Sequence, residues 1–338
     1  MKAAKVALQD AEKMKNLLLE QHLLNTDYLP TTNAEFIFFP LIDNEYTDEV
    51  EVVEMDLQKK QKTITIDDLF REFLTEEEMK HAPRSQEIIG EILLLEIPDQ
   101  LVGKEKQIAE AYLKTVKNIK TVVKKTAIHS GQFRTRRVEV LAGVDTKETT
   151  HLESGVRLFM NVEETYFSAR LGHERLRIAN LVKKGEDVLV MFSGSAPYPL
   201  VLAKHSEAKK IIGIELNPKA HGFAITNREK NKVSEERVQL INDDVRVAVP
   251  KLKQQFDRIL MPLPKTSEEF LDTALPAAKK GAFIHLYAFL NQKEIVNEGQ
   301  NIVNICEELG FELELINTVK CGQHAPYTFR VCYDLKVF

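Results

Sequence analysis

Cysteine is scarce in this chain and tryptophan is absent. The three cysteines, Cys306, Cys321 and Cys332, form no C-x-x-C pair, and the nine histidines do not cluster. This scarcity excludes a disulfide-stabilised scaffold and a structural zinc site, and it predicts a protein of the reducing cytoplasm that holds no metal. No apolar run approaches the roughly 18 residues that a membrane span needs, and the polar N-terminus is unlike a signal peptide.

The sequence also lacks a complete G-x-G-x-x-G, the loop that cradles the pyrophosphate of a dinucleotide. In its place, the valine-rich run Val188–Phe192 stops abruptly at the small residues SGSAP (193–197). The run predicts a strand buried on both faces, and small residues let backbone amides approach a ligand closely. An apolar, helix-compatible segment, Tyr198–His205, follows. A strand, a small-residue loop and a helix predict a nucleotide-type site in an α/β sheet.

Charge is distributed unevenly along the chain, whose net charge is −5. Residues 1–78 hold 8 Lys+Arg against 18 Asp+Glu, a net of −10, whereas Ala111–Val138 carries eight basic residues and no acidic one. A polyanion would therefore meet the second segment, with Lys124, Lys125 and Arg137 among its contacts. The alternative is that these charges form a solvated face.

Hydrophobic patterning predicts two small α+β domains, at residues 1–75 and 76–160, before a larger domain at 161–338. The expected elements of the first are a helix over Lys2–Leu24, strands over Phe36–Leu41 and Val50–Met55, and a helix over Ile66–Met79 that crosses into the second. The second has a basic face. Its expected elements are strands over Glu87–Ile97, Thr121–Thr126, Gln132–Leu141 and His151–Asn161, and a helix over Lys104–Asn118.

Regular alternation of strands and helices begins near residue 161. Strands are expected over Val188–Phe192, Ile211–Glu215, Val238–Ile241, Phe256–Met261 and Ala282–Tyr287, each near a helix, and two last strands over Phe311–Val319 and Thr328–Leu335 have no helix between them. Alternation predicts a parallel sheet, and the closing pair predicts antiparallel strands at its end. The fold class is therefore α/β with a Rossmann-like sheet.

Polar or rigid residues follow three of these strands. Glu215 stands 21 residues after Gly194, where an acidic side chain binds a ribose diol, or else caps the next helix. Asp243 and Asp244 are placed to contact an adenine amino group, Asp244 better than Asp243, although either could cap a helix over 245–252.

The loop after the fourth strand contains two prolines, in Pro262-Leu263-Pro264-Lys265. It is expected to form a rigid wall of the ligand crevice, or a plain helix entry. The acidic residues after the strands suit a nucleoside, but the sequence has no loop for a pyrophosphate. This combination favours S-adenosylmethionine, which contains adenosine and no pyrophosphate, over a dinucleotide.

Long motifs in one order resemble a known family. They are YFSARLGHER (166–175), MFSGSAPYP (191–199), IIGIELNP (211–218) and MPLPKTSEEFL (261–271), together with GQFRTRR (131–137). They resemble the archaeal and eukaryotic Trm-five/wybutosine group, class I methyltransferases and relatives that act on guanosine 37 of tRNA. The resemblance covers nearly the whole chain, including its N-terminal domain, which is similar to a module that binds the tRNA corner.

The resemblance implies roles for particular residues. Glu174 would remove the N1 proton of guanine, or else pair with Arg177 or Arg170. Arg134 or Arg136 would stabilise negative charge at O6, or bind phosphate, and both remain candidates. Tyr166 and Arg170 would shape the pocket for the target base, or else the ring of Tyr166 would pack under the cofactor loop. The implied cofactor contacts are Tyr166, Arg170, Phe192, Ser193, Gly194, Ser195, Pro197, Glu215, Leu216, Asn217, Asp243, Asp244, Pro262, Leu263 and Pro264, and the implied RNA contacts are Lys124, Lys125, Arg137 and Lys265.

One departure from the family's pattern concerns Pro262, where better-known methyltransferase members often have Asn. Proline cannot donate a side-chain hydrogen bond to a base, so the acceptor atom stays open. The sequence predicts a monomeric, cytoplasmic enzyme that methylates N1 of guanosine 37 in tRNA. The alternatives are C7 methylation of the wyosine precursor 4-demethylwyosine, or aminocarboxypropyl transfer at position 37. Rivals of other classes are an NAD(P)-dependent oxidoreductase and a tRNA-binding module with a vestigial site.

Overall fold

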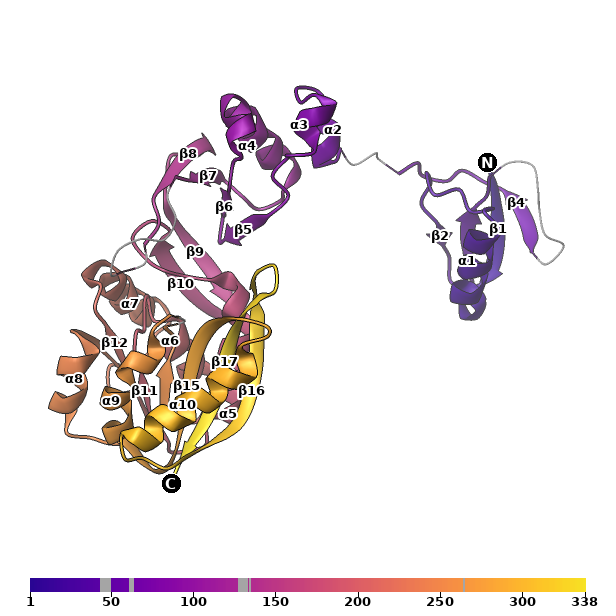
Figure 1. The fold of residues 1–338 in the computed structure, drawn as a ribbon. Helices are drawn as coiled ribbons and strands as arrows, with labels where there is room; N and C mark the ends of the chain where they lie inside the picture. Colours follow the sequence, from indigo (N-terminus) through magenta and orange to yellow (C-terminus); the bar gives the residue numbers. More distant parts are fainter. Residues whose placement is uncertain (43–49, 61–63, 127–132, 134, 264) are drawn as a thin grey trace. The chain divides into compact units, whose positions relative to one another are not determined.

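The chain folds into two compact units, Met1–Thr65 and Ile66–Phe338. The computed structural model describes residues 1–42, 50–60, 64–126, 133, 135–263 and 265–338 (Figure 1). Within these residues no helix has the length and apolar character needed to cross a membrane. The finer division at residues 75 and 160 stays a prediction.

In its described residues, the first unit is a small antiparallel sheet with one α-helix. Its sheet has the order β2-β3-β1-β4. The elements are β1 (Lys2–Ala7), η1 (Leu8–Asp10), α1 (Ala11–Glu20), β2 (Thr31–Thr32), β3 (Phe36–Pro40) and β4 (Glu51–Glu54). The predicted helix over Lys2–Leu24 is wrong at its start, because Lys2–Ala7 is a central strand paired with both β3 and β4. Alanines that suit a helix are buried here between two neighbouring strands.

The second unit begins with a four-stranded sheet, ordered β5-β6-β7-β8, and its helices. The elements are α2 (Ile66–Phe70), α3 (Glu76–Met79), β5 (Gln86–Ile89), β6 (Ile92–Leu95), η2 (Asp99–Lys104), α4 (Glu105–Thr115), β7 (Thr121–Lys125) and β8 (Val138–Gly143). The single helix predicted over Ile66–Met79 is wrong, since Thr75 caps a separate helix with its side chain. Phe70 contacts Tyr112 of α4 edge-on, at 5.8 Å between ring centroids.

Two predicted strands are hairpins instead. The run Glu87–Ile97 is β5 and β6, which reverse at Gly90, whose φ of +56° is easy for glycine. The run His151–Asn161 is split between β9 (Glu148–Glu153) and β10 (Val156–Asn161), joined by Ser154 and Gly155 at positive φ. The strand predicted over Gln132–Leu141 begins only at Val138, and its first part includes positions outside the described residues.

A seven-stranded sheet in the order β13-β12-β11-β14-β15-β17-β16 follows the β9–β10 hairpin in the chain. Neighbours are parallel from β13 to β15, and β17 is antiparallel to both β15 and β16, which confirms the predicted fold class. The strands are β11 (Asp187–Val190), β12 (Lys210–Glu215), β13 (Val238–Asn242), β14 (Phe256–Met261), β15 (Ala278–Asn291), β16 (Leu313–Ala325) and β17 (Thr328–Val337).

Helices precede and connect these strands. They are α5 (Gly172–Leu181), α6 (Pro197–His205), α7 (Pro218–Lys230), α8 (Val245–Leu252), α9 (Leu271–Ala274) and α10 (Ile295–Glu308), with short turns η3 (Ala169–Leu171), η4 (Ser267–Phe270) and η5 (Leu275–Ala277). The chain proceeds from β11 outward to β12 and β13, then returns to the other side of β11 with β14. Ligands of open α/β sheets bind at the carboxyl ends of the strands where the order switches in this way.

The N-terminal part of the second unit is tied to this sheet domain by polar contacts. Asn227 of α7 accepts a hydrogen bond from the backbone N–H of Phe159 at 2.7 Å and donates one to its carbonyl at 2.9 Å. Asn231 does the same for Arg157, at 2.9 and 2.7 Å. The backbone of β10 is therefore held by the side-chain amides of Asn227 and Asn231, which form the hydrogen bonds that a neighbouring strand would form.

Candidate active site

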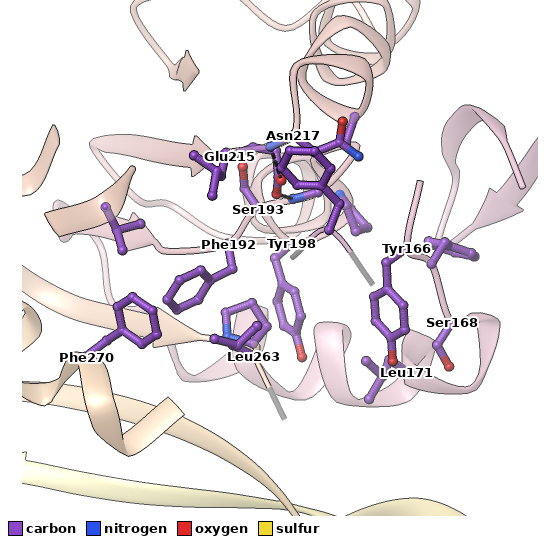
Figure 2. Close-up of a pocket in the computed structure, with 18 of the residues that line it drawn as sticks. Tyr166, Ser168, Leu171, Phe192, Ser193, Tyr198, Glu215, Asn217, Leu263 and Phe270 are labelled. Atoms are coloured by element: carbon purple, nitrogen blue, oxygen red, sulfur yellow. Dashed lines mark hydrogen bonds between the residues drawn. The ribbon is translucent and has the colours of Figure 1, made fainter. Parts of the chain in front are cut away.

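A cavity of about 200 Å³ lies at the carboxyl ends of β11, β12 and β14. Figure 2 shows aromatic side chains, the carboxylate of Glu215 and the amide of Asn217 around it. Its lining comprises Phe133, Tyr166, Phe167, Ser168, Leu171, Arg175, Phe192, Ser193, Gly194, Pro197, Tyr198, Glu215, Leu216, Asn217, Ala220, Asp244, Val245, Arg246, Pro262, Leu263 and Phe270. The position is the one that the strand order predicts.

The loop after β11 contacts the carboxylate of Glu215. Phe192, Gly194 and Ala196 all have positive φ, from +58° to +66°. The Gly194 N–H donates to Glu215 Oε2 at 2.7 Å, and the Asn217 N–H donates to Oε1 at 2.8 Å. Each oxygen of the carboxylate thus keeps acceptor capacity toward the cavity. Burial raises the pKa of Glu215 above its usual value, although these backbone donors oppose the shift.

The two aspartates after β13 differ in position. Asp244 lines the cavity and its Oδ1 also accepts from the Arg246 N–H at 2.8 Å, so it is the N-cap of α8. Asp243 does not belong to the lining; it accepts from the Asp244 N–H at 2.9 Å and pairs with Lys251 at 3.3 Å. The capping alternative therefore holds for Asp244, without removing it from the cavity.

An apolar wall faces these acids. Phe192 contacts Phe270 of η4 edge-on, at 4.8 Å between ring centroids, and the guanidinium of Arg246 lies 3.9 Å from the Phe270 centroid. Pro262 and Leu263 belong to the same lining. Phe270 and Arg246 could not be predicted from the sequence, because both follow the strand ends by several residues and no spacing rule marks them.

Most of the remaining predicted cofactor contacts line the cavity. Ser193, Pro197, Leu216 and Asn217 line the cavity, and the Asn217 side chain also caps α7 through the Lys219 N–H at 3.0 Å. Ser195 does not line it, since it is fully buried and its carbonyl accepts from Asn227 Nδ2 at 3.0 Å. Pro264 lies outside the described residues.

A second cavity, of about 790 Å³, shares Tyr166, Phe167 and Ser168 with the first. Cationic side chains dominate its charged lining: Lys125, Arg136, Arg170, Lys265 and Arg330, against the carboxylates Glu87 and Glu96. Arg170 and Lys265 belong to this cavity and not to the first. The two cavities meet at Tyr166, so a ligand in one can approach a ligand in the other across this shared wall.

Arg136 is buried at the edge of the second cavity. It donates to Glu87 Oε2 at 2.8 Å and to the Phe167 carbonyl at 3.2 Å. Burial alone would raise the pKa of Glu87, but Arg136 and Lys125 bring that pKa below its usual value. Arg134 lies outside the described residues, so its predicted role stays a prediction.

The other predicted RNA contacts lie away from this lining. Lys124 pairs with Glu105 at 2.8 Å and Glu139 at 3.0 Å, and Arg137 is exposed. Neither is among the residues that line the two cavities.

The carboxylate of Glu174 is buried, with 4% of the residue exposed. It accepts from the Tyr287 hydroxyl at 2.7 Å and from two nitrogens of Arg177 at 2.7 and 2.8 Å. Leu171, about one helical turn earlier, lines the cavity, whereas Glu174 lines neither cavity. The predicted pairing with Arg177 is present, and the predicted role as a base stays a prediction.

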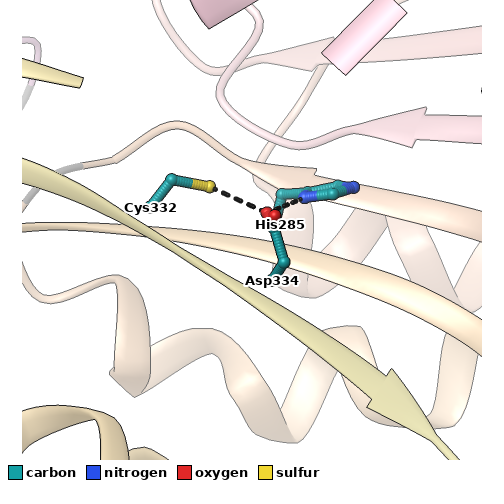
Figure 3. Close-up of side chains that lie close together, drawn as sticks. All are labelled: His285, Cys332 and Asp334. Atoms are coloured by element: carbon teal, nitrogen blue, oxygen red, sulfur yellow. Dashed lines mark hydrogen bonds and ion pairs between the residues drawn. The ribbon is translucent and has the colours of Figure 1, made fainter. Parts of the chain in front are cut away.

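A neighbouring cluster of His285, Cys332 and Asp334 has the composition of a metal site (Figure 3). Arg258 can only donate, so its 2.6 Å contact makes His285 Nε2 an acceptor, and Nδ1–H then donates to Asp334 at 2.6 Å. Burial lowers the pKa of His285 and raises that of the Cys332 thiol. Both imidazole nitrogens are therefore engaged, and the geometry favours a hydrogen-bonded cluster over a metal site.

Three family models match consecutive parts of the chain. They are the TRM5/TYW2 methyltransferase domain over residues 149–314, the TYW2 N-terminal domain over 66–146 and the tRNA methyltransferase 5 N-terminal domain over 3–48. The middle model begins at Ile66, the residue at which the second compact unit begins.

Two similar relatives carry different named activities. The tRNA (guanine(37)-N(1))-methyltransferase Trm5b of Pyrococcus abyssi is 31% identical over 99% of this chain and 98% of its own. The tRNA(Phe) (4-demethylwyosine(37)-C(7)) aminocarboxypropyltransferase of Pyrococcus horikoshii is 35% identical over 78% of this chain and 93% of its own.

Solved structures agree with these likenesses. A complex of aTrm5 with tRNALeu superposes with a TM-score of 0.74 at 27% identity, covering 100% of both chains. P. horikoshii TYW2 in complex with MeSAdo superposes with a TM-score of 0.68 at 33% identity, covering 81% of this chain and 98% of that one. With a relative at 31% identity along almost its whole length, the chain belongs to the TRM5/TYW2 family of tRNA-modifying enzymes.

Proposed function

We propose that this protein transfers the methyl group of S-adenosylmethionine to N1 of guanosine 37 in the anticodon loop of tRNA. The observation that carries the proposal is the end-to-end similarity to the P. abyssi enzyme of that activity. The structure supports it with two cavities that share one wall, the first lined by nucleoside-binding groups and the second by cations.

The first cavity fits S-adenosylmethionine. Glu215 keeps acceptor capacity for a ribose diol, Asp244 offers a carboxylate for an adenine amino group, and Phe192 with Phe270 provides an apolar slot. The Ser193 hydroxyl is buried in the lining and finds no partner among the described residues. When bound, this cofactor supplies an electrophilic methyl group.

The second cavity suits the target nucleotide. A base in the anticodon loop must leave its stack to reach an enzyme pocket, and aromatic side chains stabilise the unstacked base. Tyr166 and Phe167 stand between the two cavities, and Phe289 lines the second one. Arg136, or Arg134, would donate to guanine O6 as negative charge develops there.

Guanine N1 is a poor nucleophile until it loses its proton, so the reaction requires a base. Glu174 is the proposed acceptor of that proton. Its carboxylate is oriented by Arg177, which is itself held by Asp334 at 2.7 and 3.1 Å. Glu174 would exchange the hydrogen bond from Tyr287 for one from the nucleotide, since catalytic contacts often form only with substrate bound.

A second candidate function is transfer to C7 of 4-demethylwyosine, of a methyl or an aminocarboxypropyl group. Two observations favour it: the 35% identity to the P. horikoshii aminocarboxypropyltransferase, and Pro262 in the first cavity, where an asparagine would offer an amide. Pro262 has no side-chain donor for the edge of a guanine.

Mass spectrometry of nucleosides separates these functions. A tRNA with guanosine at position 37 and a tRNA bearing 4-demethylwyosine are each incubated with enzyme and S-adenosylmethionine. The proposal expects 1-methylguanosine from the first tRNA. Product from the second tRNA alone would replace the proposal with the second function, and product from neither, with tRNA still bound, would support a binding module.

We further propose that the enzyme acts as a cytoplasmic monomer in three domains, 1–75, 76–160 and 161–338. The first would add tRNA contacts remote from the anticodon. Both cavities lie within the second compact unit, so the site is complete without a second copy.

A further inference from the structure

Arg330 of β17 differs from the other buried arginines of the described residues, because no carboxylate among these residues pairs with it. The described residues include four such side chains, Arg136, Arg175, Arg258 and Arg330. The first three each donate to a carboxylate: Glu87 at 2.8 Å, Glu153 at 2.6 Å and Glu186 at 2.8 Å. No carboxylate of the described residues forms an ion pair with Arg330, although only 8% of this residue is exposed.

The contacts of Arg330 are neutral. One terminal nitrogen donates to the Tyr166 hydroxyl at 2.9 Å and the other lies 3.4 Å from the Ser168 hydroxyl. Its guanidinium lies 4.9 Å from the ring centroid of Phe289, its register partner on β15. Its Nε is buried and has no acceptor among the described residues. Such a charge is costly to bury without a counter-ion.

The position of Arg330 indicates where the missing anion belongs. Arg330 lines the second cavity and not the first, so the counter-ion enters with the ligand of the second cavity. If the proposed function holds, that ligand is a nucleotide of tRNA, whose base is neutral and whose phosphate is anionic. A guanidinium presents several N–H donors in a planar fork that matches phosphate oxygens.

We propose that Arg330 binds a phosphate oxygen of the target nucleotide and at the same time fixes Tyr166 at the wall between the two cavities. This inference rests on the proposed function and adds a residue to it. The carboxylate of the cofactor is the competing anion. The experiment below separates the two sources.

The test compares Arg330→Met and Arg330→Lys with the unaltered protein. Affinity for tRNA is measured by fluorescence anisotropy at several salt concentrations with S-adenosylhomocysteine present, and affinity for S-adenosylhomocysteine by calorimetry. Arg330→Met should weaken tRNA binding about tenfold. It should reduce the slope of log K against log salt by about 0.7–0.9, because one phosphate contact is lost. Affinity for S-adenosylhomocysteine should not change.

Arg330→Lys keeps the charge and should keep the salt slope while losing part of the affinity, and it serves as the test if the Met variant does not fold. Lys184→Met is the matched control. Lys184 is exposed in the connection between α5 and β11, at the amino ends of the parallel strands and away from both cavities. Its removal should leave tRNA affinity and salt slope as they are.

Two results would overturn the assignment of phosphate to Arg330. One is an Arg330→Met variant that keeps both the affinity and the salt slope of the unaltered protein. The other is a selective loss of affinity for S-adenosylhomocysteine, which would assign the guanidinium to the cofactor carboxylate. Unaltered protein that binds no tRNA would overturn the proposed function itself, and that measurement comes first.

Discussion

At the scale of single residues, Glu174 has the expected partner Arg177 but lines neither cavity. The carboxylate is buried, doubly bonded to Arg177 and bonded to the Tyr287 hydroxyl. Leu171 of η3 and Arg175 of α5 line the first cavity, whereas Glu174 does not. Its proposed role as a base therefore requires that it exchange the hydrogen bond from Tyr287 for one from the nucleotide.

Glu174→Gln should lower kcat for methyl transfer by about 10²–10⁴, because an amide cannot take up the N1 proton. Affinity for S-adenosylhomocysteine should be unchanged, since Glu174 lines no part of the first cavity. Single-turnover assays with labelled cofactor and calorimetry measure the two quantities. Glu229→Gln, on an exposed position of α7, is the control. A Glu174→Gln enzyme with full activity would remove Glu174 from the mechanism.

The ionisation of Glu215 should make the affinity for S-adenosylhomocysteine depend on pH. A ribose diol donates to the ionised carboxylate, and burial raises the pKa of this group. Affinity for S-adenosylhomocysteine should therefore be full above the raised pKa and should fall as the pH drops through it, at a higher pH than for an exposed glutamate. Glu215→Gln should bind more weakly and lose this dependence. Calorimetry across the acidic range checks both, and an equally steep dependence in the variant would assign the titration to another group.

At the scale of elements, the strands and helices of residues 187–338 could be predicted from hydrophobic runs, because the central strands β11, β12 and β14 are largely buried on both faces and each ends at a loop. The β5–β6 and β9–β10 hairpins could not. An apolar run such as EIIGEILLLEI reads as one strand, and only the positive φ of Gly90 shows that it reverses. Likewise, the alanines of β1 suit a helix until the neighbouring strands are known.

The candidate site likewise contains residues that could be predicted from the sequence and residues that could not. Glu215, Asp244 and the SGSAP loop follow strands directly, so the order of strands predicts where they meet. Arg246 and Phe270 come from elements that pack against the strand ends, and Arg330 comes from the antiparallel pair. Those positions depend on tertiary packing, which the hydrophobic periodicity of the sequence does not predict.

Gly90 gives a test at this scale. A Cβ there would overlap Thr149 Oγ1 and lie 2.5 Å from the carbonyl oxygen of Thr150, at a φ of +56°. Gly90→Ala should destabilise the second unit by at least about 2 kcal/mol, lowering its melting temperature by about 4–8 °C. Gly103→Ala is the matched control, because its Cβ would meet no atom within 4 Å and its φ is ordinary. Equal melting temperatures for the two variants would contradict the hairpin geometry.

At the scale of the whole molecule, the two compact units have separate cores. The core of the first comprises Ala4, Val6, Leu18, Phe39 and Leu41, with partly buried neighbours that all precede residue 66. The three other cores contain only residues from 66 onward. Each unit therefore buries its apolar surface within itself, which is the condition for independent folding.

A protein that begins at residue 66 should consequently fold and bind S-adenosylhomocysteine with the affinity of the full chain, since every residue that lines the first cavity lies in the second unit. Its affinity for tRNA should fall, because the first unit is proposed to supply contacts remote from the anticodon. A short RNA hairpin with only the anticodon arm separates these effects: the full and shortened proteins should bind it equally. Weaker binding of the hairpin by the shortened protein would show instead that the first unit acts at the anticodon, and unchanged binding of whole tRNA would deny it any part in recognition.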